Sequence, residues 1–173
     1  MGIMRNSYTH VIHPFPPFFD EESRILILGS FPSVRSRETG FYYGHKQNRF
    51  WKVLSSLRKE EEPLTLDEKK AFLKRNHIAL YDVIQECDII ASSDSSVRNA
   101  VPSDLKKIVT SSKIRAVFCN GTLAAKLYEK YQKESLPLPC YFLPSTSAAN
   151  AAMRLEDLER KWAVINDILE GEE

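Results

Sequence analysis

The sequence predicts a three-layer α/β/α sandwich built around a central four-stranded, mostly parallel sheet. Short runs of branched apolar residues recur along the chain, and such runs are typical of buried strands. Segments with apolar residues at helical spacing lie between these runs. Because strands that alternate with helices pair in parallel, helices are expected on both faces of the sheet.

Each of the four predicted strands is a short apolar run followed by a turn-forming residue. The first covers 24–28 and ends at Gly29. The others are expected at 78–81, where the pattern is weakest, at 114–119 and at 140–143. Ligands of such sheets bind outside the carboxyl ends of the strands, so we expect the functional site at that edge.

Helices are predicted in the intervals between the strands. The segment 50–57 carries one apolar face, and Thr65, followed by acidic residues, predicts the start of a helix over 66–75. Three further helices are expected: one capped by Ser103, one over 121–131 and one over 156–169.

The length of 173 residues predicts a single domain over residues 1–173, with residues 1–23 as an N-terminal arm. The segment 13–19 is rich in Pro and Phe. Proline holds the chain extended, so this part of the arm is expected to cover an edge of the core with its rings.

Composition excludes several classes of protein. The three cysteines are few, odd in number and far apart, so neither a disulfide framework nor a zinc site is expected, and a reducing, cytoplasmic location is predicted. No signal peptide or membrane-spanning apolar run is visible, so no membrane partner is expected. No dinucleotide or phosphate-loop motif follows Gly29, so no nucleotide cofactor is expected.

Small polar or turn-forming residues follow all four predicted strands. They are Gly29–Ser33, Asp82, Asn120–Gly121 and Pro144–Asn150. The need for a turn explains the residues after any single strand. Four such segments around one crevice predict a binding site.

The segment 41–51 combines five aromatic rings with His45, Lys46, Asn48 and Arg49. Aromatic faces stack on nucleobases and cations contact phosphates. The stretch 34–59 holds seven Lys or Arg against one acid, a local excess typical of a nucleic-acid backbone contact on an otherwise neutral chain. Asn48 stands just before a predicted helix, so it either caps that helix or faces a bound base or water.

Two motifs resemble the first active-site region of the uracil-DNA glycosylase superfamily. They are Leu28-Gly-Ser-Phe-Pro-Ser33 and Tyr42-Tyr-Gly-His-x-x-Asn-Arg-Phe-Trp51. The segments 78–83, 118–121 and 143–147 stand in the order of the later regions. The Ser-Phe-Pro-Ser form is similar to the hypoxanthine-DNA glycosylase branch.

Two departures refine what the resemblance implies. Phe31 stands where most branches place the Asp or Asn that handles the attacking water, and the resemblance implies that Asn48 supplies the catalytic amide instead. Leu143 stands where several branches place a His that contacts the leaving base, which argues against efficient uracil excision. Asp82 is a rival to Asn48 for handling the water.

The resemblance implies a monofunctional DNA glycosylase that flips out a deaminated base, above all hypoxanthine, and hydrolyses its N-glycosidic bond in base excision repair. The expected partner is DNA containing such a base, and the enzyme is expected to be a monomer without metal or cofactor. The expected base pocket comprises Gly29, Ser30, Phe31, Pro32, Ser33, Tyr43, His45, Asn120 and Ser145. The expected DNA-binding residues are Arg35, Arg37, Lys46, Arg49, Ser147 and Asn150.

Three other functions stay open at this point. The first two are excision of uracil, xanthine or a mismatched base, and DNA binding on the same scaffold without catalysis. Hydrolysis of free nucleosides is disfavoured, because a nucleoside needs no track of cations for phosphates.

Overall fold

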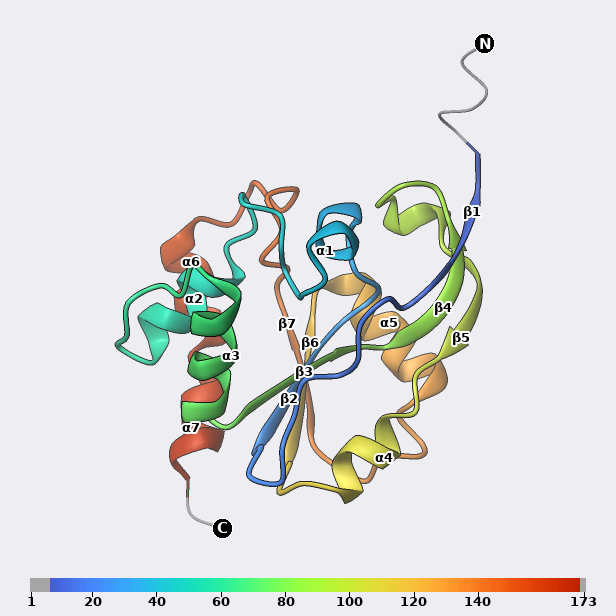
Figure 1. Cartoon of the computed structure of the whole chain (residues 1–173). Coiled ribbons are helices and arrows are strands. Elements are labelled where there is room, and N and C mark those ends of the chain that lie inside the picture. The colour runs from blue at the N-terminus through green and yellow to red at the C-terminus, as the bar shows by residue number, and fades with distance from the viewer. Residues whose placement is uncertain (1–6, 172–173) are drawn as a thin grey trace.

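A computed structural model describes residues 7–171 and contains the predicted parallel sheet (Figure 1). Its strands are β2 (Ile25–Gly29), β3 (Ile78–Asp82), β6 (Ala116–Asn120) and β7 (Cys140–Leu143). They pair in parallel in the order β3-β2-β6-β7. The predicted fold class and all four predicted strands are therefore confirmed.

Helices cover both faces of this sheet (Figure 1). Ile25 and Ile27 of β2 pack into one cluster, while Leu26 and Leu28 pack into another on the opposite face. Complete burial of each such side chain contributes about 1.5 to 3 kcal/mol, which is why an uninterrupted apolar run forms a central strand. One face is covered by α2 (Phe50–Leu57), α3 (Leu66–Arg75), α6 (Leu155–Trp162) and α7 (Val164–Glu170). The other face is covered by α4 (Leu105–Thr110) and α5 (Thr122–Tyr131).

The helix ends differ in part from the prediction. Thr65 begins α3 as predicted, and the structure adds a capping box in which the Glu68 side chain accepts from the Thr65 N–H. Ser103 does not cap α4, because its hydroxyl donates to the carbonyl of Asp82 at 2.7 Å and Asp104 takes the capping role. The predicted last helix is two helices that meet at Ala163, although neither Gly nor Pro marks the break.

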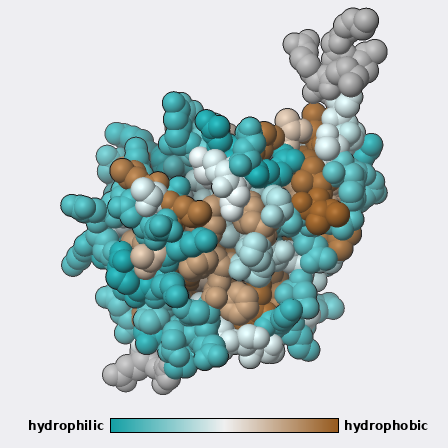
Figure 2. Space-filling model, in the orientation of Figure 1, coloured by the Kyte–Doolittle hydropathy of each residue, from teal (hydrophilic) through white to brown (hydrophobic). Residues whose placement is uncertain are grey.

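A second, antiparallel sheet was not predicted. It consists of β1 (Thr9–Ile12), β4 (Ile84–Ile89) and β5 (Arg98–Pro102), in the order β1-β4-β5. Most of β1 and β5 is exposed, so neither strand shows a clear apolar alternation in the sequence. Figure 2 shows hydrophobic atoms gathered along the β1 edge, where Ile12 is 65% exposed.

The N-terminal arm continues from β1 across the edge of the large sheet. Phe15 is buried, and Phe18 forms an isolated bridge with Leu80 of β3. Within residues 7–171, no helix is both long and apolar enough to cross a bilayer.

Candidate active site

A cavity of about 670 Å³ lies at the carboxyl edge of the parallel sheet. Its volume falls in the range of sites that enclose small ligands. All nine residues of the expected base pocket line it, together with Asn48 and Ser147. The cavity walls come from the loop after β2, from the aromatic segment, from the ends of β3 and β6, and from the loop after β7.

Gly29 is required by a close approach between β2 and β3. Gly29 pairs directly with Asp82 across the two strands. A Cβ atom added to Gly29 would lie 2.5 Å from Oδ1 of Asp82, a separation that two non-bonded atoms do not tolerate. Because Gly29 has no side chain, the Asp82 carboxylate has room beside the cavity.

Asp82 is held by a buried histidine of the N-terminal arm. Nε2 of His13 lies 2.7 Å from Oδ2 of Asp82, and the His13 side chain is 2% exposed. The His13 ring packs against Phe15 and Tyr81. Sequence reasoning missed His13, because nothing local in a Pro- and Phe-rich arm indicates a partner 69 residues away.

The two tyrosines of the aromatic segment have different roles. Tyr42 is buried, and its hydroxyl donates to the carbonyl of Pro16, so it anchors the arm. Tyr43 adopts φ +52°, an uncommon conformation for a bulky residue, and stacks on Phe50 with ring centroids 3.9 Å apart. Burial raises the pKa of the Tyr43 phenol, so this side chain lines the cavity as a neutral ring.

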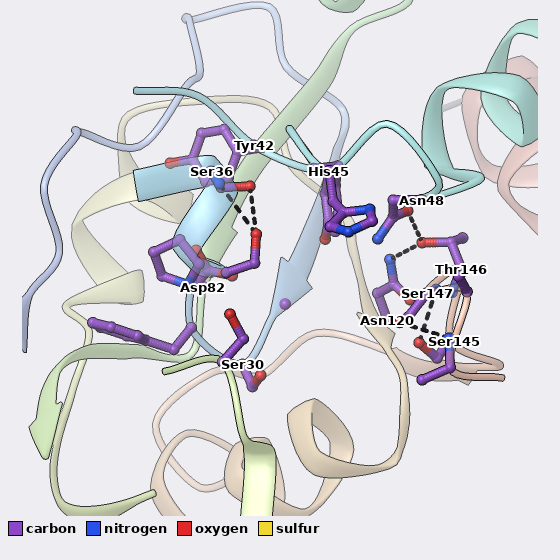
Figure 3. Close-up of a pocket in the computed structure, with 18 of the residues that line it drawn as sticks. Ser30, Ser36, Tyr42, His45, Asn48, Asp82, Asn120, Ser145, Thr146 and Ser147 are labelled. Carbon is purple, nitrogen blue, oxygen red and sulfur yellow. Dashed lines mark hydrogen bonds between the residues drawn. The ribbon is translucent and has the colours of Figure 1, made fainter. Parts of the chain in front are cut away.

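The Asn48 side chain faces the cavity and belongs to a chain of hydrogen bonds (Figure 3). Its Oδ1 accepts from the backbone N–H of Phe50 at 3.0 Å and from the Thr146 hydroxyl at 2.8 Å. Asn120 donates from Nδ2 to the same hydroxyl at 3.0 Å and accepts from the Thr146 N–H at 3.1 Å. Arg49, and not Asn48, is the N-cap residue of α2, so the predicted capping role of Asn48 is wrong. Asn48 instead accepts from the first N–H of the helix, and its side chain still lines the cavity.

Thr146 is the central member of this chain, and sequence reasoning did not single it out. Its exposed fraction is 0%, whereas its neighbours Ser145 and Ser147 were expected at the site. A run of similar small polar residues does not reveal which one turns inward. That choice depends on Asn48 and Asn120, which reach Thr146 from other segments.

Arg49 holds the loop after β7 and is engaged within the protein. Its guanidinium donates to the carbonyls of Thr146, Ser147, Asn150 and Met153. Its donors are therefore occupied by backbone carbonyls, which differs from the expected phosphate contact. Asn150, also expected to bind DNA, instead donates from its side chain to the carbonyl of Ser145.

Of the other three expected cations, one is engaged within the protein and two are exposed. Arg37 donates to the carbonyl of Ala91 at 2.6 Å and lies over the Phe31 ring, and desolvation lowers its pKa. Arg35 and Lys46 are exposed. Lys46 lies between two residues that line the cavity, and Arg35 precedes one, Ser36, so these two cations are available for contacts outside the protein.

An unexpected rim comes from the turn between β4 and β5. Ser92, Ser93 and Ser95 line the cavity from this side. The Ser92 hydroxyl accepts from the backbone N–H of Val34 at 2.8 Å, which ties the turn to the short helix α1 (Val34–Thr39). Among residues 7–171, no group of three or more His, Cys, Asp or Glu is arranged to hold a metal ion.

Comparison with known proteins gives one family and close relatives. Residues 16–169 match the family model described as the uracil DNA glycosylase superfamily. The chain is 32% identical over 155 residues to a protein of Methanosarcina acetivorans named hypoxanthine DNA glycosylase, covering 87% of this chain and 95% of the relative. It is 37% identical over 86 residues to a Methanosarcina barkeri protein of the same name, covering 49% and 54%.

A solved structure shares the fold. It is a solution NMR structure of a Methanosarcina acetivorans protein assigned as a uracil DNA glycosylase. The TM-score is 0.79 at 31% identity, over 92% of this chain and 99% of the other.

Proposed function

Because the chain belongs to the uracil DNA glycosylase superfamily, we propose that it is a monofunctional DNA glycosylase that releases hypoxanthine from deoxyinosine in DNA. This reaction is the first step of base excision repair. The observation that carries the proposal is the Asn48 amide, which faces a cavity of nucleotide size at the carboxyl ends of parallel strands. The name shared by the two curated relatives supports hypoxanthine as the base.

The target nucleotide reaches this cavity by leaving the base stack. Unstacking costs a few kcal/mol and costs least for a mispaired base such as hypoxanthine. Contacts from exposed Arg35 and Lys46 to phosphates offset part of this cost. Lys46 lies between His45 and Gln47, which both line the cavity, so a phosphate contact there would leave the flipped base near the mouth.

Polar and aromatic groups in the lining suit a purine base. Phe31 and Tyr43 offer ring faces for stacking, although one face of Tyr43 is already covered by Phe50. Ser30 and Ser145 present hydroxyls for the edge of the base. Hypoxanthine carries both a ring N–H and acceptor atoms, and hydroxyls serve both as donors and as acceptors.

Cleavage of the N-glycosidic bond passes through a sugar with oxocarbenium character. The base departs with growing negative charge, and groups that act chiefly in the transition state contribute most. We therefore expect Asn48→Ala to lower the rate of hypoxanthine release by about 100- to 1,000-fold while DNA binding persists.

The test uses end-labelled duplexes that carry hypoxanthine, uracil or xanthine, followed by alkaline cleavage of abasic sites. Wild-type protein is compared with Asn48→Ala, and an undamaged duplex is the control. We expect strand breaks at hypoxanthine that depend on Asn48. Release of uracil or xanthine in preference to hypoxanthine would contradict hypoxanthine as the substrate and identify the preferred base instead. Binding without release of any base would show a DNA-binding protein without this activity.

A further inference from the structure

We propose that Asn48 acts as a hydrogen-bond donor to the departing base, and that Thr146 is the positioning residue that fixes this polarity. The inference rests on the proposed glycosylase function and adds the direction of the catalytic hydrogen bond. It follows from hydrogen bonds that leave each side-chain amide only one orientation.

Two backbone N–H groups set the orientations, because an N–H can only donate. The N–H of Phe50 faces the Asn48 amide, so the atom that it meets is the oxygen Oδ1. The N–H of Thr146 faces the Asn120 amide, so that atom is also an oxygen. Nδ2 of Asn120 is then left to donate to the Thr146 hydroxyl.

The hydroxyl of Thr146 passes this direction on to Asn48. A hydroxyl carries one hydrogen, and its oxygen already accepts from Asn120. Its hydrogen is therefore donated to Oδ1 of Asn48, 2.8 Å away. Oδ1 receives two hydrogen bonds in total, from Thr146 and from Phe50, which occupy both of its lone pairs.

The cavity is therefore offered the NH₂ group of Asn48. None of the side-chain hydrogen bonds found among residues 7–171 uses its Nδ2 atom, and the side chain lines the cavity beside His45 (Figure 3). An oxygen with both lone pairs engaged is a poor acceptor for a proton of the attacking water. The NH₂ group instead suits an atom that gains negative charge.

The departing base gains negative charge during the reaction. When the bond between C1′ and the base breaks, its electron pair leaves with hypoxanthine and spreads over ring nitrogens and the carbonyl oxygen. A water molecule supplies the new C1′–O bond, and its proton balances the charge of the released base. A donor placed in advance stabilises the developing anion without reorganising at the moment of reaction.

Thr146 is suited to positioning because it is rigid. Its side chain is fully buried, and its carbonyl accepts from the backbone N–H of Arg49 at 3.0 Å. Without the Thr146 hydroxyl, the Asn48 oxygen keeps only the Phe50 partner, and Nδ2 of Asn120 loses one acceptor. The Asn48 amide is then free to tilt away from the base.

The decisive experiment compares two variants of Asn48 in single-turnover release of hypoxanthine at about pH 8, where an introduced carboxyl group is ionised. Asn48→Asp still accepts from Phe50 and Thr146 but has no hydrogen to donate. We expect its rate to be no higher than that of Asn48→Ala. A rate tenfold or more above Asn48→Ala would overturn the donor role and favour activation of water.

Variants of Thr146 test its positioning role. We expect Thr146→Val to lower the rate by about tenfold with unchanged affinity for DNA, and Thr146→Ser to restore the rate. Thr110→Val, at an exposed position on α4, is the matched control. A wild-type rate in Thr146→Val, or a loss in Thr146→Ser equal to that in Thr146→Val, would overturn the role.

Two measurements separate misfolding from a loss of the Asn48 donor role. Thermal melting identifies a Thr146 variant that does not fold, and the two Asn48 variants then decide the donor role by themselves. If wild-type protein releases no hypoxanthine, the proposed function fails. If wild-type protein is active and the rate of Asn48→Asp is tenfold or more above that of Asn48→Ala, only the donor role of Asn48 fails.

Discussion

Substitution of Arg49 distinguishes a cation that contacts DNA from a cation that stabilises the loop after β7. Arg49→Met keeps the apolar stem of the side chain and removes the guanidinium. The structure predicts a loss of stability, because this group donates to four carbonyls of the loop after β7. A phosphate-binding arginine would instead affect DNA affinity with little effect on stability.

The size of the effect follows from these contacts. A hydrogen bond to a charged group contributes about 1.5 to 3 kcal/mol. The four bonds share one guanidinium and are not additive, and the freed carbonyls regain water because Arg49 is only partly buried. We therefore expect Arg49→Met to lower the free energy of unfolding by about 2 to 4 kcal/mol, a fall in Tm of roughly 4 to 16 °C.

Urea denaturation and the salt dependence of duplex binding measure the two quantities separately. Lys46→Met is the matched variant, because Lys46 is exposed. We expect Lys46→Met to keep its stability within about 0.5 kcal/mol. Its plot of log affinity against log salt should lose about 0.9 of slope, as for one phosphate contact.

The opposite pattern would refute this reasoning. If Arg49→Met unfolds like the wild type and loses about 0.9 of the salt slope, Arg49 contacts a phosphate. The hydrogen bonds to the loop would then contribute little to stability.

Three further predictions concern the floor of the cavity, the small sheet and metal ions. Gly29→Ala places a Cβ atom 2.5 Å from Oδ1 of Asp82, so we expect urea denaturation to show a loss of about 1 to 3 kcal/mol; unchanged stability would mean that the strands separate freely. Hydrogen bonds that His10 donates to Asp88 and, more weakly, to Glu86 raise the pKa of His10 above 6.5. The His10 contribution to β1–β4 pairing is thus fully present below about pH 6.5 and lost as pH rises through the folded pKa. An NMR titration should show the raised midpoint falling in Asp88→Asn, and an equal midpoint in both proteins would contradict the contact. Because no group of three or more His, Cys, Asp or Glu within residues 7–171 is arranged to hold a metal ion, we expect excision to survive EDTA. Activity lost in EDTA but restored by zinc or magnesium would refute this expectation.

The elements of the parallel sheet were predictable because their signals are local. A run such as Ile25–Leu28 is apolar on both faces, and only a central strand covered by helices buries it. The positions of the strand ends followed, and with them the cavity residues that directly follow the strands, but not the rim of Ser92, Ser93 and Ser95. The strands β1 and β5 were not predictable, because their exposed residues form strands only by pairing with β4.

By itself, the sequence determined the parallel sheet, the edge at which the site lies, and the amide and aromatic rings brought to that edge. Only the tertiary structure decided which cations face outward, that His13 contacts Asp82, and that Thr146 donates to Asn48. The reason is physical: apolar periodicity acts between near neighbours in the chain, whereas Thr146 meets Asn48 across 98 residues. The direction of a hydrogen bond is set only when folding brings both partners together.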